Sequence, residues 1–155
     1  MGYTHYWRRP KELDTGRFLK FVEDVRRLYA ALPERSNAHE GYEDEPLRIA
    51  GANGRGKPEF LVGHVAFNGW GELSHESFRM DRVMRACKPK GGLCFDFCKT
   101  ARKPYDLLVC ASLIALKRHL PEVDVSSDGG AKEWAEAVKF CERVIGPALH
   151  DGPWV

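Results

Sequence analysis

The stretch from Cys94 to Asp106 gathers more chemically capable side chains than any other part of the chain. It reads CFDFCKTARKPYD, in which an apolar strand leads through a basic turn to a proline that suits the first turn of a helix. The free amides of a helix N-terminus attract anions, and nearby cations and hydroxyl groups strengthen such a site. We therefore predict an anion-binding turn that uses Lys99, Thr100, Arg102, Lys103, Tyr105 and Asp106. The alternative is a solvated basic turn in which Asp106 stabilises the start of its own helix.

A similar turn precedes the last predicted helix. Ser127, Asp128 and Gly129 follow a short strand and are candidates for contact with a ligand. A simple helix N-cap explains Ser127 or Asp128 equally well. If the two strand-to-helix turns lie at the same edge of the sheet, they line one pocket.

Aromatic residues crowd the predicted N-terminal strand, which reads Tyr-Thr-His-Tyr-Trp over residues 3–7. His5, Tyr6 and Trp7 are candidates for stacking on a nucleobase. A single histidine on a strand is more often a satisfied structural group, and that alternative stays open for His5. Asn68 joins the ligand-binding candidates, and together with Gly69 it forms a strong turn signal.

His75 and Glu76 are the candidates for general acid–base catalysis. Neighbouring residues of a strand point to opposite faces, so the two side chains meet at one site only if the chain bulges. An ordinary polar hairpin is the favoured interpretation.

The five cysteines do not follow a usual zinc pattern. Cys87, Cys94 and Cys98 are spaced C-x6-C-x3-C, whereas zinc sites favour closer pairs and a fourth ligand, which His75 or His119 would have to supply. Buried structural thiols are favoured over a zinc site through Cys94 and Cys98, and we expect no cofactor. A second hypothesis makes Cys98 a nucleophile activated by the basic turn. Cys110 and Cys141 fall on apolar helix faces.

The sequence GANGRGKP at residues 51–58 matches the spacing of a phosphate-binding loop, but we interpret it as a hairpin loop. Pro58 stands where that motif requires Ser or Thr, and the residues that follow indicate a strand instead of a helix.

Length and composition indicate a single domain over residues 1–155. The net charge of +2 excludes the global basic field of a general nucleic-acid binder, although local basic clusters remain. No secretory signal or apolar membrane span is present, so we expect a cytoplasmic protein with reduced thiols that has no membrane partner.

Hydrophobic periodicity predicts an α+β fold, with a small, mostly antiparallel sheet and about three helices packed on it. The first helix carries an apolar stripe from Phe18 to Leu32, with Asp14 or Thr15 as its N-cap and Pro33 as its stop. Helices are also predicted over about 104–119 and after residue 130. Strands are predicted at 3–7, 47–50, 60–67, 93–97 and 123–126, with a hairpin arm within 72–80 and a polar, exposed loop at 34–46.

Several motifs together resemble a group of small proteins from bacteriophages and bacterial genomes. They are GYTHYW at the N-terminus, FNG at 67–69, His75-Glu76, FCKTARKPYD at 97–106 and SDG at 127–129. The resemblance implies a mobile-element context in a bacterial host cell and transfers no catalytic roles.

Three hypotheses about function follow. The first is a phage-type protein that binds a phosphorylated small ligand, specifically a nucleotide, by the turn at 99–106 and serves as a counter-defence factor. The second is an enzyme that acts on a nucleotide or nucleic acid through His5 or His75 and a carboxylate partner. The third is a protein-binding inhibitor of a host complex, such as an anti-CRISPR. Its contact surface would be the acidic loop with Glu34, Glu40, Glu43, Asp44 and Glu45, or the basic segment from Arg79 to Lys90.

Overall fold

A three-stranded antiparallel sheet forms the centre of the fold. The computed structural model describes residues 2–147, and in it β1 (Thr4–Arg9) lies between β6 (Cys94–Lys99) and β7 (Asp124–Ser127). Tyr6 of β1 stands opposite Phe97 of β6 and Ser126 of β7. Because both outer strands are antiparallel to β1, β6 and β7 are parallel to each other and enclose β1 as a split βαβ unit.

A second antiparallel sheet is built around β4 (His64–Gly69). It pairs with β2 (Ile49–Ala50), β3 (Glu59–Leu61) and β5 (Phe78–Asp81), and a short 3-10 helix, η1 (Gly71–Leu73), lies between β4 and β5. The prediction of one strand over residues 60–67 is wrong. Leu61 pairs with His64, so Val62 and Gly63 form a two-residue turn that splits the apolar run into a hairpin. The hairpin arm predicted within 72–80 corresponds in part to β5.

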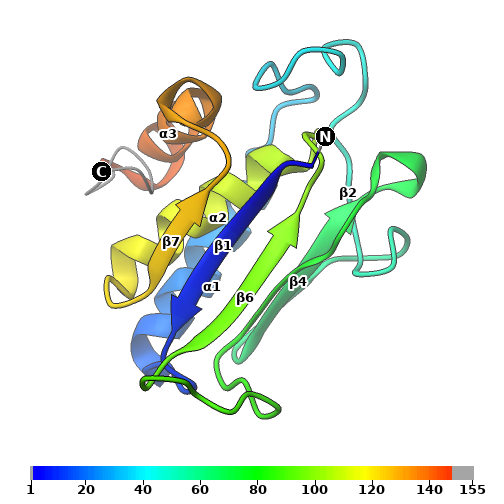
Figure 1. The fold of residues 1–155 in the computed structure, drawn as a ribbon. Helices are drawn as coiled ribbons and strands as arrows, with labels where there is room; N and C mark the ends of the chain where they lie inside the picture. Colours follow the sequence, from blue (N-terminus) through cyan, green and yellow to red (C-terminus); the bar gives the residue numbers. More distant parts are fainter. Residues whose placement is uncertain (1, 148–155) are drawn as a thin grey trace.

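Three helices complete the fold, which confirms the predicted α+β class. The helix α1 (Thr15–Ala30) begins at Asp14, whose carboxylate accepts a hydrogen bond from the Arg17 amide at 2.9 Å. The helix α2 (Asp106–His119) connects β6 to β7, and α3 (Ala131–Ile145) follows β7. In Figure 1, α1 and α2 lie behind the strands β6, β1 and β7, whose other face is turned to the viewer.

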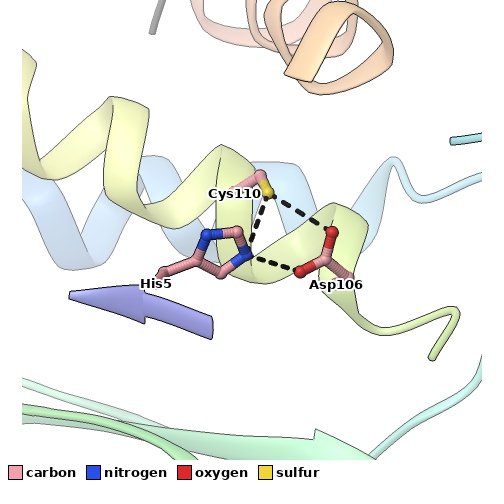
Figure 2. Close-up of side chains that lie close together, drawn as sticks. All are labelled: His5, Asp106 and Cys110. Carbon is pink, nitrogen blue, oxygen red and sulfur yellow. Dashed lines mark hydrogen bonds and ion pairs between the residues drawn. The ribbon is translucent and has the colours of Figure 1, made fainter. Parts of the chain in front are cut away.

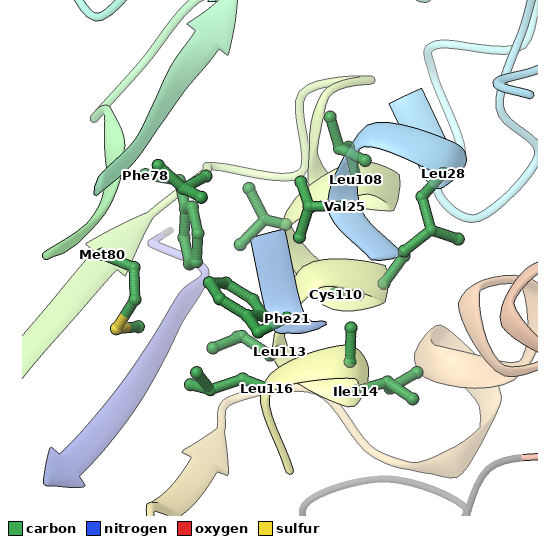
Figure 3. Packing of buried hydrophobic residues seen from close by; sticks show 14 of the residues in the cluster. Phe21, Val25, Leu28, Phe78, Met80, Leu108, Cys110, Leu113, Ile114 and Leu116 are labelled. Carbon is green, nitrogen blue, oxygen red and sulfur yellow. The ribbon is translucent and has the colours of Figure 1, made fainter. Parts of the chain in front are cut away.

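The core lies between this sheet and the helices. Apolar side chains of α1 and α2 meet Phe78 and Met80 of β5, as Figure 3 shows. The helix α2 is buried along almost its whole length, because α1 and α3 pack on it from two sides. Its sequence is correspondingly apolar all round, as expected for a central helix.

Arg9 is a buried cation that joins the two sheets. Its side chain is 1% exposed, and its guanidinium donates hydrogen bonds to the carbonyl oxygens of Lys11 at 3.1 Å, Arg82 at 2.8 Å and Asp81. Burial lowers the pKa of Arg9 to about 10, against the opposing effect of Asp81 and Asp96, so the group stays charged at neutral pH. It holds the end of β5 against the end of β1.

The expectation that all thiols are reduced is wrong for two of them, because Cys87 and Cys94 form a disulfide. Lys90 pairs with Leu93 in an isolated bridge, and this turn brings the two cysteine Cα atoms to 6.1 Å, within the range that a disulfide spans. Cys98, Cys110 and Cys141 are free and buried. Among residues 2–147, no helix has both the length and the apolar character needed to cross a bilayer.

Candidate functional site

Asp106, the first residue of α2, is the centre of a buried polar network. Its carboxylate is 1% exposed. The oxygen Oδ1 lies 2.7 Å from both His5 Nε2 and Thr100 Oγ1, while Oδ2 lies 2.7 Å from His39 Nε2 and 3.5 Å from Cys110 Sγ. Figure 2 shows His5, Asp106 and Cys110 of this group side by side. A strand, two turns and a helix thus converge on one carboxylate.

Ser127 decides which nitrogen of His5 carries the proton. The hydroxyl oxygen of Ser127 accepts hydrogen bonds from the Gly129 amide at 2.9 Å and from Trp134 Nε1 at 3.2 Å. A hydroxyl has one proton and two lone pairs, so Ser127 must donate its proton to His5 Nδ1, at 2.7 Å. His5 Nε2 therefore carries a proton and donates it to Asp106.

The surroundings of Asp106 keep its carboxylate ionised. Burial acts to raise the pKa of Asp106, but the interactions with His5 and the hydrogen bond from His39 outweigh burial. The net effect is a pKa well below the usual value. The carboxylate is therefore a fixed internal acceptor at neutral pH.

His5, Asp106 and Cys110 are also the residue types that bind zinc, and one ligand atom of each lies within 4.8 Å of the others. Two ligands of a tetrahedral zinc ion lie about 3.3 Å apart. The 2.7 Å between His5 Nε2 and Asp106 Oδ1 is instead a hydrogen-bond distance. Burial, followed by the charge of Asp106, raises the pKa of Cys110 far above the usual value, so Cys110 is a thiol. The geometry is that of a hydrogen-bonded network.

Ser127, His5 and Asp106 include the three groups of a hydrolytic triad, but they are not arranged for attack on a substrate. His5 is 0% exposed, and the Ser127 hydroxyl already makes three hydrogen bonds. The network instead joins β1, β7, α2 and the turn after β6 through buried hydrogen bonds.

The predicted anion-binding turn is folded around this internal carboxylate. The amides of Lys103 and Asp106 donate to the carbonyl oxygens of Thr100 and Lys103, and the Leu107 amide donates to Pro104. Ala101 and Arg102 adopt the left-handed conformation, with φ of 52° and 60°. The amides that open α2 are thus occupied within the turn itself.

The cations of the same turn point to different neighbours. The Arg102 guanidinium lies 4.4 Å from the centre of the Tyr3 ring, and Lys103 Nζ lies 3.3 Å from the Glu72 carbonyl oxygen. Lys99 makes a contact through its main chain instead, because its backbone amide donates to the Glu76 carboxylate at 2.8 Å.

The remaining candidates are either buried in the protein or located at its surface. Trp7 and Tyr105 are buried, Trp7 against Phe78 and Tyr105 with its hydroxyl donating to the Glu76 carbonyl oxygen. Asn68 is also buried, and its side chain donates to the His75 carbonyl oxygen and accepts from the His75 amide. The exposed group consists of His75, Glu76 and Asp128, and Asp128 also accepts a hydrogen bond from the hydroxyl of half-buried Tyr6 at 3.1 Å.

The cysteine hypotheses can be compared with this geometry. Burial raises the pKa of Cys98, and the charges of Asp106 and Glu76 add to that effect, so Cys98 is not an activated nucleophile. Cys94 is in a disulfide, which leaves no zinc site through Cys94 and Cys98. The expectation of buried thiols is confirmed for Cys98, Cys110 and Cys141, and it is wrong for Cys87 and Cys94, which form the disulfide.

Sequence reasoning missed an exposed aromatic surface on the outer face of the central sheet. Phe95 and Phe97 are 51% and 49% exposed. The Phe95 ring lies 6.3 Å from the Tyr6 ring, nearly parallel to it, and 6.0 Å from the Phe97 ring. The Arg8 guanidinium lies 5.3 Å from the centre of the Phe95 ring. We call Tyr6, Arg8, Phe95 and Phe97 the aromatic face.

The signal for the aromatic face was present in the alternation of β6. Cys94 and Cys98 point into the protein, so the period of two along a strand requires Phe95 and Phe97 to point outward. The sequence already indicated that Cys94 and Cys98 share one face of the strand. The outward orientation of Phe95 and Phe97 follows from the same alternation.

A hollow of about 560 Å³ adjoins the aromatic face. It lies beside the disulfide and is bounded by Arg8, Lys88, Lys90 and the Phe95 ring, with Met84, Ala86 and Leu93 completing its wall. Three cations and no carboxylate therefore line it among the described residues. We call this space the basic hollow.

No family model, curated protein or solved structure matches the chain. The geometry of the described residues is accordingly the basis of the functional proposal that follows.

Proposed function

We propose that the protein binds a nucleotide, with the base stacked on the aromatic face and the phosphate in the basic hollow. The observation that carries this proposal is the position of Phe95. Its half-exposed ring belongs to the aromatic face and also forms part of the wall of the basic hollow. A planar base and a phosphate, which are the two halves of a nucleotide, are thus offered complementary surfaces side by side.

Physical chemistry supports both halves of this arrangement. Stacking of a base on an aromatic side chain contributes about 1–3 kcal/mol and does not depend on which base is present. Arginine and lysine bind phosphate through short, charge-assisted hydrogen bonds. The disulfide closes the segment that carries Lys88 and Lys90, so these cations lose less conformational freedom when a ligand binds.

The proposal keeps the expected ligand class but changes the residues that hold the phosphate. Arg8, Lys88 and Lys90 take the role first expected of Lys99, Arg102 and Lys103. The side chain of Arg102 rests on Tyr3, and that of Lys103 lies near Glu72. Tyr6 keeps its expected stacking role. Binding of this kind requires no turnover, and in a mobile-element context it fits a counter-defence factor that sequesters a host nucleotide.

Calorimetric titration with ATP, adenosine and inorganic tripolyphosphate tests the proposal. Phe95→Ala should weaken ATP and adenosine binding, by roughly 5- to 150-fold for a lost stack, and leave tripolyphosphate binding nearly unchanged. Lys88→Ala should weaken ATP and tripolyphosphate but not adenosine. Leu61→Ala is the matched control, because Leu61 is equally exposed (51%) but lies on β3 of the second sheet.

Two results would overturn the proposal. One is the absence of binding to all three compounds by the unmodified protein. The other is ATP binding that survives both Phe95→Ala and Lys88→Ala, which would place the ligand elsewhere. Self-association that disappears in Phe95→Ala, without nucleotide binding, would instead show that the aromatic face is a protein contact.

A further inference from the structure

We infer that the ligand is a polymer, and that a single-stranded nucleic acid runs along β6 and β1 across the aromatic face. This inference rests on the proposed function and adds the substrate class. A mononucleotide has one base to stack and one phosphate group to place in the basic hollow. The surface has more aromatic rings and cations than one nucleotide can contact. The additional groups lie along β6 and β1.

The first observation is the number of rings. Tyr6, Phe95 and Phe97 all belong to the outer face, with Tyr6 directly opposite Phe97 across the β1–β6 pair. Their centres are about 6 Å apart, so each ring can present a surface to a different base. Sheet-based RNA-binding domains use the same device, in which aromatic side chains on neighbouring strands stack on two or three unpaired bases.

The second observation is the separation of the cations. The basic hollow lies at the start of β6, and Lys99 lies at its end. Five residue steps of a strand correspond to roughly 17 Å. Nucleotides follow one another at about 3.4 Å along one strand of a duplex, so a single nucleotide does not reach from the hollow to Lys99. An oligonucleotide of about three to five nucleotides is long enough to reach from the basic hollow to Lys99.

The third observation concerns the part of the outer face on which the nucleic acid lies. Asp124 on β7 and Asp128 directly after it are both exposed, and Asp124 pairs in register with Arg8. These carboxylates repel phosphate, whereas residues 82–92, next to the start of β6, contain four cations and no acidic residue. Arg82 of this segment is paired with Glu12, and Arg85, Lys88 and Lys90 are the other three. In Figure 1 the strands β6 and β1 face the viewer without a covering helix among the described residues, so the proposed path is open.

The polymer must be single-stranded because the rings stack only on bases that are free of their own partners. The duplex hides its bases, and its backbone would have to approach the acidic β7 side as well. The geometry does not distinguish DNA from RNA, since stacking and phosphate contacts are common to both, and the test therefore includes both.

Fluorescence anisotropy with labelled oligothymidylates of 2, 5 and 10 nucleotides, rU10 and a dT10·dA10 duplex tests the inference. We expect affinity to rise at least tenfold between 2 and 5 nucleotides and then to change little, with the duplex binding at least tenfold more weakly. Neutralising three or four phosphates predicts a slope of about −2 to −3 in log K against log salt concentration.

Variants separate the polymer from the mononucleotide. Phe97→Ala should weaken dT10 binding by roughly 5- to 150-fold and TMP binding by a smaller factor, because a base whose phosphate lies in the basic hollow is next to Phe95. Phe95→Ala should weaken both. Asp124→Lys should strengthen dT10 binding at low salt, and Leu61→Ala should change neither. Circular dichroism of each variant confirms that these exposed positions leave the fold intact.

The outcomes distinguish the inference from the proposed function. Equal affinity for dT2 and dT10, with TMP binding that still requires Phe95, overturns the polymer and leaves the nucleotide-binding proposal standing. Duplex binding as tight as single-strand binding also overturns it. If neither TMP nor any oligonucleotide binds, the proposed function and the inference fail together.

Discussion

His39 Nε2 lies 2.7 Å from Asp106 Oδ2, and this contact ties the long segment between α1 and β2 to the first turn of α2. The two residues are 67 positions apart in the sequence. His39 is 7% exposed although it belongs to a polar segment, residues 34–46, that was predicted to be an exposed loop. The prediction is wrong for His39 and for Ser36, which is 4% exposed. Asp106 thus connects the segment that carries His39, which lies outside the strands, to the start of α2.

Removing the charge of Asp106 should destabilise the whole fold. In Asp106→Asn the new amide group faces donors of His5, His39 or Thr100, so at least one buried donor loses its acceptor. We expect a loss of about 3 kcal/mol in the free energy of unfolding, measured by urea denaturation. Asp14→Asn is the matched control, because asparagine caps a helix as well as aspartate does and should leave stability nearly unchanged. Equal stability of the two variants would contradict a central role for Asp106.

The contribution of Asp106 should also depend on pH in a defined direction. Its pKa in the folded protein lies below the value in the unfolded chain, which is about 3.9. A depressed pKa stabilises the fold fully above the unfolded value, and that stability is lost as pH falls toward the folded value. The stability difference between the unmodified protein and Asp106→Asn should therefore be constant from about pH 5 to 7 and shrink below about pH 4. Urea titrations at a series of pH values measure it, and a difference that grows on acidification would exclude this account.

The five cysteines should divide into two classes when alkylated and weighed by mass spectrometry. In the native protein, iodoacetamide should modify none of Cys98, Cys110 and Cys141, because all three are buried and burial is the main cause of their raised pKa values, about 12 for Cys141. After denaturation without a reductant, three thiols should react, and a reductant should add Cys87 and Cys94. Rapid native labelling of Cys98 would revive the hypothesis of a reactive thiol at that position.

Arg8 and Arg9 should give opposite results although they are neighbours on β1. Arg9→Lys removes the planar fork that serves several carbonyl oxygens at once and should lower the free energy of unfolding by about 2–3 kcal/mol. Arg8→Lys, an identical change at an exposed position, should leave stability within about 0.5 kcal/mol. Thermal and urea denaturation of both variants measure the contrast. A stability loss of similar size in both would show that burial of the guanidinium is not the cause.

The helices were the part of the fold that local sequence could predict. The stripe from Phe18 to Leu28, the cap at Asp14 and the apolar length of α2 are signals within a few residues of each other. Strand positions were also close, since the predicted strands at 3–7, 93–97 and 123–126 overlap β1, β6 and β7. The turn within residues 60–67 was missed because Val62 is an apolar residue at an exposed position, and hydrophobic periodicity alone does not show that.

The candidate site was predictable only in part, because its contacts join distant residues. His5, Thr100, Asp106 and Ser127 were candidates in three separate sets, and the structure brings all four together in the buried network. No local pattern marks His39 as a partner of Asp106, and no pattern shows that the four side chains would bind one another. The aromatic face depends on which side of β6 is covered, and that is decided by helices elsewhere in the chain.

The alternation of β1 from His5 to Arg9 divides these five residues into two sets with different freedom to change. His5, Trp7 and Arg9 are buried and fix the fold, whereas Tyr6 and Arg8 face outward. The same division holds on β6, where Phe95 and Phe97 lie between buried cysteines. Substitutions at the outward positions can therefore accumulate without unfolding the protein. Such a surface can follow a changing target through a few point mutations while the frame that carries it stays constant.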